Sequence, residues 1–120
     1  MEAKKGYKAQ VKHLLISPKK LRPIADTIRR KPYNQAIAIL ETTPKRGAGL
    51  IKKVVQSAVA NALYQNNKLD EDSLYISEVF INEGPRMKRV WARARGRRDI
   101  LLKRMSHISV VVDEIARMGE

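Results

Sequence analysis

The fifteen residues Gly84–Arg98 constrain this chain more than any other stretch, because seven of them are Lys or Arg and none is acidic. Alternating apolar segments lie on both sides, Leu74–Ile81 before the stretch and Ile100–Val112 after it. Two such segments joined by one connection predict a β-hairpin. The connection is much longer than the loop of a plain hairpin, and a long connection of distinct composition is usually functional or disordered.

Seven like charges repel one another, so this stretch does not favour a compact conformation of its own. Extended as two arms of about seven residues, it would project roughly 20–25 Å at about 3.3 Å per residue. Such a cationic arm needs a polyanion to neutralise it. A solvated basic loop is the alternative, and the interleaved Met87, Val90 and Trp91 argue against it. An aromatic ring between arginines suits stacking on an unpaired base.

The composition narrows the class of partner. A net charge of +13 on 120 residues indicates a nucleic acid or an anionic membrane surface. No apolar run approaches the length of a membrane span, so we expect no insertion into a membrane. Met1–Lys5 lacks the apolar stretch of a signal peptide, and without Cys there is no disulfide and no thiolate metal site. A cytosolic protein is the expectation.

The charge is concentrated in two blocks. Residues 1–32 carry a net charge of +8 and residues 84–104 another +8, while residues 33–83 carry −1 and residues 105–120 carry −2. The length fits a single domain over 1–120. We expect a globular part at 1–83 and 100–113, and an extended hairpin tip at 84–99.

A strand is expected at residues 7–15, because Tyr7, Ala9, Val11 and His13 alternate with polar residues. The opposite face of that strand is mostly basic. A lone His on the apolar side is most often an interior residue, so we expect His13 to be buried.

Three helices are expected next. Ser17-Pro18 is typical of a helix start, and Pro23 predicts a kink or an irregular first turn. Lys31-Pro32 should end this helix, since the residue before Pro avoids the helical region. Asn34 can cap a shorter second helix, and Thr43-Pro44 opens a third that runs to about residue 67. The third helix presents a long apolar stripe and is expected to be the centre of the core.

The remaining elements complete the fold prediction. The acids at 70–72 lack the spacing of a calcium loop, so a solvated turn is expected there. Strands follow at Leu74–Ile81 and, after the basic stretch, where Ile108, Val110 and Val112 alternate with His107, Ser109 and Val111. The order predicts an α+β fold, a three-stranded antiparallel sheet packed on three helices with a long protruding basic hairpin.

The sequence does not support catalysis. Nucleophilic chemistry needs a Ser or Cys with a base and an orienting group, and only His13 and His107 could act as imidazole bases. Both lie in strand patterns with no acid-rich motif nearby. Gly47-Ala48-Gly49 lacks the spacing and the Lys of a phosphate-binding loop, and no zinc-ligand set is present. We expect no enzyme, no cofactor and no metal, which leaves a binding protein.

Several motifs, in order along nearly the whole chain, resemble the bacterial large-subunit ribosomal protein family numbered twenty-two. They are Ile16–Arg22, Ala25–Arg29, Thr43–Arg46, Ser57–Ala62, Glu83–Pro85, Arg93–Arg97 and Lys103–Val112. The chain departs from the family pattern at Pro23, and at Trp91-Ala92, where the family usually has Met-Pro.

The resemblance implies a ribosomal function. The family has an α+β globular domain on the outside of the large subunit that contacts several ribosomal RNA domains. Its long hairpin lines the nascent-peptide exit tunnel. The implied partners are large-subunit ribosomal RNA, neighbouring ribosomal proteins and the nascent peptide, with no homo-oligomer, in the cytoplasmic ribosome.

The expected RNA contacts fall in the two basic blocks. Lys19, Lys20 and Arg22 would belong to the globular footing, and residues 86–98 to the tunnel and RNA contacts. Met87 and Trp91 are candidates for base stacking or tunnel lining. The full expected set of RNA-binding cations is Lys8, Lys12, Lys19, Lys20, Arg22, Arg86, Lys88, Arg89, Arg93, Arg95, Arg97, Arg98, Lys103 and Arg104.

Two other classes fit the charge. A basic architectural protein could place a β-ribbon in a DNA groove, although such proteins usually dimerise and no long exposed dimer stripe is evident. A peripheral membrane protein would need a helix with Lys on one face and aromatic residues on the other. The expected helices lack such a face.

Overall fold

The centre of the fold is an antiparallel sheet of three strands, β1 (Tyr7–Leu14), β2 (Leu74–Glu83) and β5 (Ser106–Glu114), in the order β1-β5-β2. The computed structural model describes residues 6–84, 87–92 and 98–115, with residues 87–92 and 98–103 described by their backbone alone. β5, the last strand in the sequence order, thus forms the middle strand, between two strands that are separated by 59 residues in the sequence.

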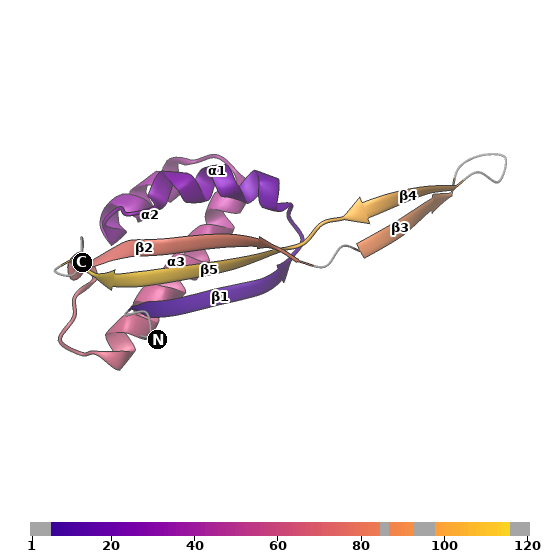
Figure 1. Ribbon diagram of the computed structural model, residues 1–120. Helices are drawn as coiled ribbons and strands as arrows, with labels where there is room; N and C mark the ends of the chain where they lie inside the picture. Colours follow the sequence, from indigo (N-terminus) through magenta and orange to yellow (C-terminus); the bar gives the residue numbers. More distant parts are fainter. Residues whose placement is uncertain (1–5, 85–86, 93–97, 116–120) are drawn as a thin grey trace.

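Three helices pack against this sheet (Figure 1). They are α1 (Pro18–Ile28), α2 (Tyr33–Thr42) and α3 (Arg46–Gln65), and a short 3-10 turn at Glu71–Ser73 leads into β2. α1 and α2 contact β2, whereas α3 lies against β1 and β5. The α+β prediction of three strands on three helices is therefore confirmed.

The core lies between the sheet and the helices. Ala9 pairs with Val110, which pairs with Val79, and all three side chains are buried on the same face of the sheet. Of the core residues expected on α3, Val54, Val55 and Ala58 are buried and Leu63 is partly buried. The other buried apolar side chains are Leu21, Ile24, Ala25, Ile28, Ala36, Leu40, Ala48, Ile51, Val59, Ala62, Leu74, Tyr75, Ile76, Ile81, Ile108 and Val112.

The boundaries of α2 and α3 differ from the expected ones, because Thr43 and Asn34 form other hydrogen bonds than the capping bonds that the local sequence predicts. Thr43 does not open α3: its hydroxyl donates a 2.8 Å hydrogen bond to the carbonyl oxygen of Ile39, so it closes α2. α3 begins three residues later, at Arg46. Asn34 does not cap α2 either, because Pro32 holds that position and the Asn34 amide donates a hydrogen bond to Asp72.

The first helix runs through Pro23 without interruption and ends at Ile28. Pro23 is exposed, so its ring lies on the solvent side of the helix. The end comes before Lys31-Pro32 because Arg29 has an extended backbone, with ψ 134°, and Arg30 then adopts a left-handed conformation, with φ 64°. Its amide then donates a 2.8 Å hydrogen bond to the carbonyl oxygen of Ile76, which ties the turn after α1 to the edge of β2.

The prediction that His13 is buried was wrong. Between Val11, which pairs with Ile108, and Leu14, which pairs with Ser106, β1 carries one residue more than its partner strand. This bulge interrupts the alternation, and His13 lies on the surface with φ 62°. Its backbone amide donates a 3.1 Å hydrogen bond to Nδ1 of His107, and the two rings meet edge to face at 4.9 Å.

A second antiparallel sheet has two strands, β3 (Met87–Ala92), which lies within the basic stretch, and β4 (Arg98–Lys103), which begins at its last residue. The register pairs Met87 with Lys103 at one end and Ala92 with Arg98 at the other. A hairpin at this place was expected. The last expected strand, with Ile108, Val110 and Val112, is confirmed as part of β5. Arg104 and Met105 divide the alternating apolar segment Ile100–Val112 into β4 and β5.

Candidate nucleic-acid interface

A basic groove lies where the beginnings of α1 and α3 meet the connection between β4 and β5. It has a volume of about 700 Å³. Five cationic side chains line this basic groove: Lys19, Lys20, Lys45, Arg46 and Arg104. The rest of its lining is Leu15, Ile16, Ser17, Pro23, Ile24 and Gly47. Three segments that are distant in the sequence therefore bring their positive charges to one hollow that contains no acidic residue.

The two helix starts add to this positive potential. A helix N-terminus carries a partial positive charge and unpaired N–H groups, and acidic residues usually occupy its first turn. Neither α1 nor α3 has an acidic residue in its first turn, and the helices carry Lys19, Lys20 and Arg46 there instead. Basic residues in the first turn destabilise the two helices slightly, and they make both helix starts favourable for a bound anion.

A glycine allows the two helices to approach closely beside the basic groove. A Cβ atom added at Gly47 of α3 would lie 2.8 Å from Cδ2 of Leu21 and 3.1 Å from Cδ1 of Ile24, both on α1. Because Leu21 is fully buried, its methyl group has little room to move. The absence of a side chain at this position thus fixes the spacing between the two basic helix starts.

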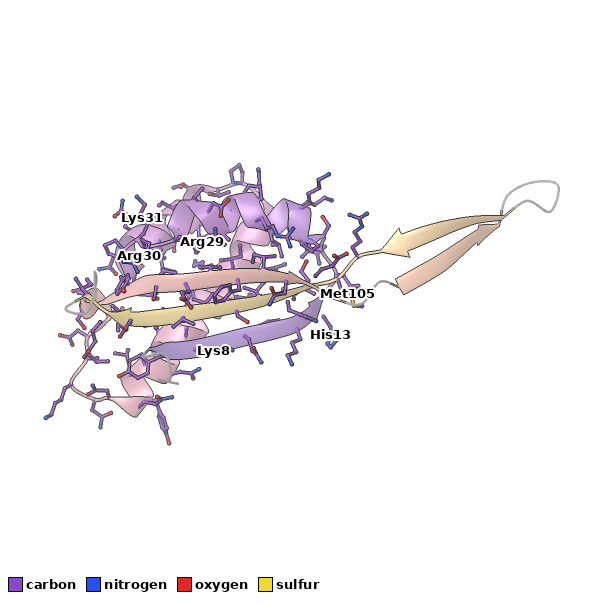
Figure 2. All side chains as sticks on the ribbon, viewed as in Figure 1. Lys8, His13, Arg29, Arg30, Lys31 and Met105 are labelled. Carbon is purple, nitrogen blue, oxygen red and sulfur yellow. The ribbon has the colours of Figure 1, made fainter. Side chains whose placement is uncertain are left out.

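Two hydrogen bonds hold the connection between β4 and β5, which carries Arg104, in place. The buried Ser106 hydroxyl donates a 2.5 Å hydrogen bond to the carbonyl oxygen of Ile16, and the Gly84 amide donates a 2.8 Å bond to the carbonyl oxygen of Met105. Arg104 directly precedes Met105 and Ser106, which make these two bonds, so its backbone is anchored next to the start of α1. Figure 2 shows Met105 and His13 at this same end of the sheet.

A second, smaller hollow of about 190 Å³ adjoins the basic groove. It shares Lys19 and Arg104 with the groove and is otherwise lined by Pro18, Arg22 and Glu83. The acid makes this hollow less favourable for a phosphate than the basic groove. A bound polyanion is therefore favoured on the side of Lys20, Lys45 and Arg46.

The structure brings some of the predicted contact residues together and separates others. Lys19 and Lys20 of the first basic block and Arg104 of the second line one groove. Lys8 and Lys12 are exposed on β1, away from that lining, and Figure 2 shows Lys8 along the strand. Arg86, Arg93, Arg95 and Arg97 lie outside the described residues. The side chains of Met87, Lys88, Arg89, Trp91, Arg98 and Lys103 likewise lie outside the description, which gives their strands as backbone.

Arg22 has a structural partner that the sequence did not indicate. Its guanidinium donates a 3.3 Å hydrogen bond to the carbonyl oxygen of Ile81. The guanidinium of Arg29, directly after the end of α1, donates hydrogen bonds of 3.3 and 2.8 Å to the carbonyl oxygen of Val79. β2 is an edge strand, so these arginines satisfy carbonyl groups that would otherwise be open to another chain. Figure 2 shows Arg29 beside Arg30 and Lys31 at the far end of α1.

Lys45 and Arg46 are the residues that the sequence-based selection missed. They lie in the near-neutral middle of the chain, where the local charge gave no reason to choose them. The available signal was the same at both helices: a helix start with basic residues and no acid in the first turn. That signal becomes informative only when the fold shows that the two starts are neighbours.

Two other classes of site find no support within residues 6–84, 87–92 and 98–115. Those residues contain no group of three or more His, Cys, Asp or Glu that could hold a metal ion. No helix among them is long and apolar enough to cross a membrane.

Comparison with known proteins identifies the family. The family model for ribosomal protein L22p/L17e matches residues 9–113. The large ribosomal subunit protein uL22 of Treponema denticola is 55% identical over 120 residues, which cover 100% of both chains. The protein of the same description from Treponema pallidum is 50% identical over 111 residues, covering 92% of this chain and 90% of its own length. That of Borrelia duttonii is 49% identical over 120 residues and covers 100% of both chains. The chain therefore belongs to the ribosomal protein L22p/L17e family, and as a ribosomal protein it is a structural component and not an enzyme.

Proposed function

We propose that this protein is a structural constituent of the large ribosomal subunit that binds ribosomal RNA through its globular part and extends a basic hairpin into the peptide exit tunnel. Its partners are large-subunit ribosomal RNA, neighbouring ribosomal proteins and the nascent peptide. It acts as a single copy in the cytoplasmic ribosome. Family membership supports the ribosomal setting, and the relatives named above are large-subunit proteins.

The observation that carries the RNA-binding proposal is the basic groove. Five cations from three separate segments converge on it, and the starts of two helices without acids in their first turns line the same hollow. Phosphate groups are the ligands that such a surface attracts, because the cations and the helix N–H groups both favour an anion. Most of the groove cations are side chains on rigid helices, so little ordering is needed on binding.

The hairpin is proposed as a separate functional part. The pairing of β3 with β4 supports an extended arm, since six paired residues per strand span roughly 20 Å at about 3.3 Å per residue. The predicted division places the tip at 84–99 and the globular part at 1–83 and 100–113. Because β3 and β4 form a sheet distinct from β1-β5-β2, the arm has its own hydrogen-bonded backbone and does not depend on the core strands for pairing.

The alternative function is that of a basic architectural protein that binds DNA. The basic groove alone does not discriminate between the two nucleic acids, because phosphate contacts are the same in both. The discriminating experiment compares the affinity of the purified protein for large-subunit ribosomal RNA and for duplex DNA of equal length at equal salt. We expect the RNA to bind at least about tenfold more tightly. Equal affinities would contradict the proposal and favour the architectural protein.

A further inference from the structure

The floor of the basic groove is apolar, which a surface for phosphates alone does not need. Leu15, Ile16, Pro23 and Ile24 line the same hollow as the five cations, and these four residues are called its apolar floor. Leu15 is 58% exposed, whereas Leu21 in the helix that follows is fully buried. A single exposed leucine is common on a protein surface. Leu15 differs in its position, because it lines the same hollow as five cations and three further apolar residues.

The size of the basic groove restricts that ligand. A volume of about 700 Å³ lies within the range of small-molecule pockets and is large enough for one nucleotide. A paired RNA helix would rest on the rim and place its charged phosphates and sugars above the apolar floor. The flat face of a nucleobase is the part of a nucleic acid that matches an apolar surface, and in RNA it is available where the nucleotide is unpaired.

The arrangement of charge fits the two phosphates that flank a single nucleotide. Lys45 and Arg46 come from the start of α3, whereas Lys19, Lys20 and Arg104 come from the start of α1 and the β4–β5 connection. The four apolar residues belong to the same lining as these two groups of cations. The adjoining hollow shares Lys19 and Arg104 with the groove and includes the acidic residue Glu83.

We infer that the basic groove holds one unpaired nucleotide extruded from an RNA helix, with its base against Leu15 and Pro23 and its flanking phosphates against the groove cations. This inference rests on the proposed function, that the protein binds RNA. It adds that the globular part recognises a bulged or looped nucleotide and not the regular backbone of a helix.

The test uses three RNA hairpins that share one stem sequence. The first carries a one-nucleotide bulge, the second an abasic site at that bulge, and the third is fully paired. Fluorescence anisotropy with the full-length protein at fixed salt gives the dissociation constant for each. We expect the bulged RNA to bind about tenfold more tightly than the abasic one, because the base covers apolar surface of Leu15 and Pro23 that the abasic site leaves open to water. The fully paired hairpin should bind no better than the abasic one.

Variants separate the base contact from the charge. Leu15→Ser should remove the preference for the bulged over the abasic RNA and leave the salt dependence unchanged, because Leu15 carries no charge. Tyr64→Ser is the matched control, since Tyr64 is an exposed hydrophobic residue on α3 that lies outside the groove lining. Lys20→Ala should weaken all three RNAs by the same factor.

The outcomes distinguish the inference from the function on which it rests. Equal affinity for all three RNAs, with a steep salt dependence, overturns the extruded nucleotide and leaves RNA binding in place. Weak binding of every RNA without salt dependence overturns the RNA-binding function itself. An acidic peptide rich in Glu and Leu serves as a competitor. If it displaces the bulged RNA better than a single-stranded RNA of equal charge does, the occupant is a protein segment and the inference is wrong.

Discussion

The hydroxyl of Ser106 donates a 2.5 Å hydrogen bond to the carbonyl oxygen of Ile16, a residue 90 positions earlier in the chain. Ser106 is fully buried at the first position of β5, and Ile16 lies in the connection that leads from β1 into α1. This one bond therefore joins the place where the chain returns from the hairpin to the floor of the basic groove. It also holds Arg104 beside Lys19 and Lys20.

Ser106→Ala should reduce the free energy of unfolding by about 1–3 kcal/mol, because the substitution leaves the carbonyl group of Ile16 without its donor. Urea denaturation measures the change. Ser57→Ala is the control, since Ser57 is exposed on α3 and its replacement should change stability by no more than about 0.5 kcal/mol. If both variants were equally stable, the bond would not couple the two segments.

The two glycines at the start of α3 should respond oppositely to alanine. Nothing lies within 4 Å of a Cβ atom at Gly49, so Gly49→Ala should stabilise the protein by about 0.5–1 kcal/mol through helix propensity. Gly47→Ala places a methyl group 2.8 Å from Cδ2 of Leu21 and should destabilise by about 1–3 kcal/mol. Thermal unfolding of both variants measures the difference. Stabilisation by both would show that α1 can move away from α3 without cost.

Tyr33 should make the stability sensitive to alkaline pH. Burial raises the pKa of the Tyr33 hydroxyl above its ordinary value of 10.0, and the carboxylates of Glu71 and Glu41 act in the same direction. Above about pH 10 the unfolded chain therefore releases a proton that the folded chain retains. The stability that Tyr33 contributes is full below that pH and is lost as the pH rises towards the raised pKa.

The free energy of unfolding of the parent minus that of Tyr33→Phe should accordingly stay constant from about pH 7 to pH 10 and fall above it. Tyr64→Phe is the control, because the Tyr64 ring is 89% exposed. Denaturation in urea at each pH gives the two differences. A Tyr33→Phe difference that rises with pH would reverse the sign and contradict the effect of burial.

A shortened hairpin tests the proposed division between globular part and tunnel arm. Deletion of Trp91-Ala92 together with Arg98-Asp99 removes two complete pairs of the β3–β4 register and leaves the net charge unchanged. It should shorten the arm by roughly 6–7 Å at about 3.3 Å per residue. Because these residues pair in a sheet separate from β1-β5-β2, the stability of the globular part should change by no more than about 0.5 kcal/mol.

The shortened protein should still enter large subunits and should change the passage of stalling peptides and the effect of drugs that bind in the tunnel. Purified mutant ribosomes allow both to be compared with the parent. Normal incorporation with both responses unchanged would show that the arm does not shape the tunnel. Failure to incorporate would show that the arm is needed for assembly.

The elements could be predicted from the sequence because each has a local signal. Alternation in β1 and β2, the apolar stripe of α3 and the proline after Ser17 are all visible within short windows. The failures have non-local causes. His13 lies on the surface because a bulge against β5 shifts the register, and Thr43 ends a helix because its hydroxyl bonds backward to Ile39.

The candidate site was predictable only in part for the same reason. Lys19, Lys20 and Arg104 belong to basic blocks that the charge distribution marks, and their convergence could not be read from either block alone. Lys45 and Arg46 enter the groove because Gly47 packs closely on α1, a contact between segments more than twenty residues apart. Arg22 has the sequence context of a contact residue, yet its guanidinium also bonds to Ile81 in the edge strand.

Arg29 should prove to be a structural residue and not an RNA contact. Its guanidinium bonds to Asp26 and to the carbonyl oxygen of Val79. Arg29→Ala should therefore lower the free energy of unfolding by about 1 kcal/mol, a value reduced by the exposure of the side chain. Its RNA affinity at fixed salt should stay within about twofold of the parent, whereas Lys20→Ala should weaken binding without a loss of stability. The reverse pattern would contradict the assignment of these two cations.

The salt dependence of RNA binding tests most directly the central claim, that the basic groove binds the phosphates of ribosomal RNA. Each neutralised phosphate contributes about −0.7 to −0.9 to the slope of log affinity against log salt. With half a dozen contacts, the slope for the full-length protein on large-subunit RNA should be at least about −4. The double variant Lys20→Ala, Arg46→Ala should be shallower by about 1.4–1.8, and Lys53→Ala, which removes an exposed cation outside the groove lining, should match the parent. A parent slope shallower than about −2, or a double variant with the slope of Lys53→Ala, would contradict the claim.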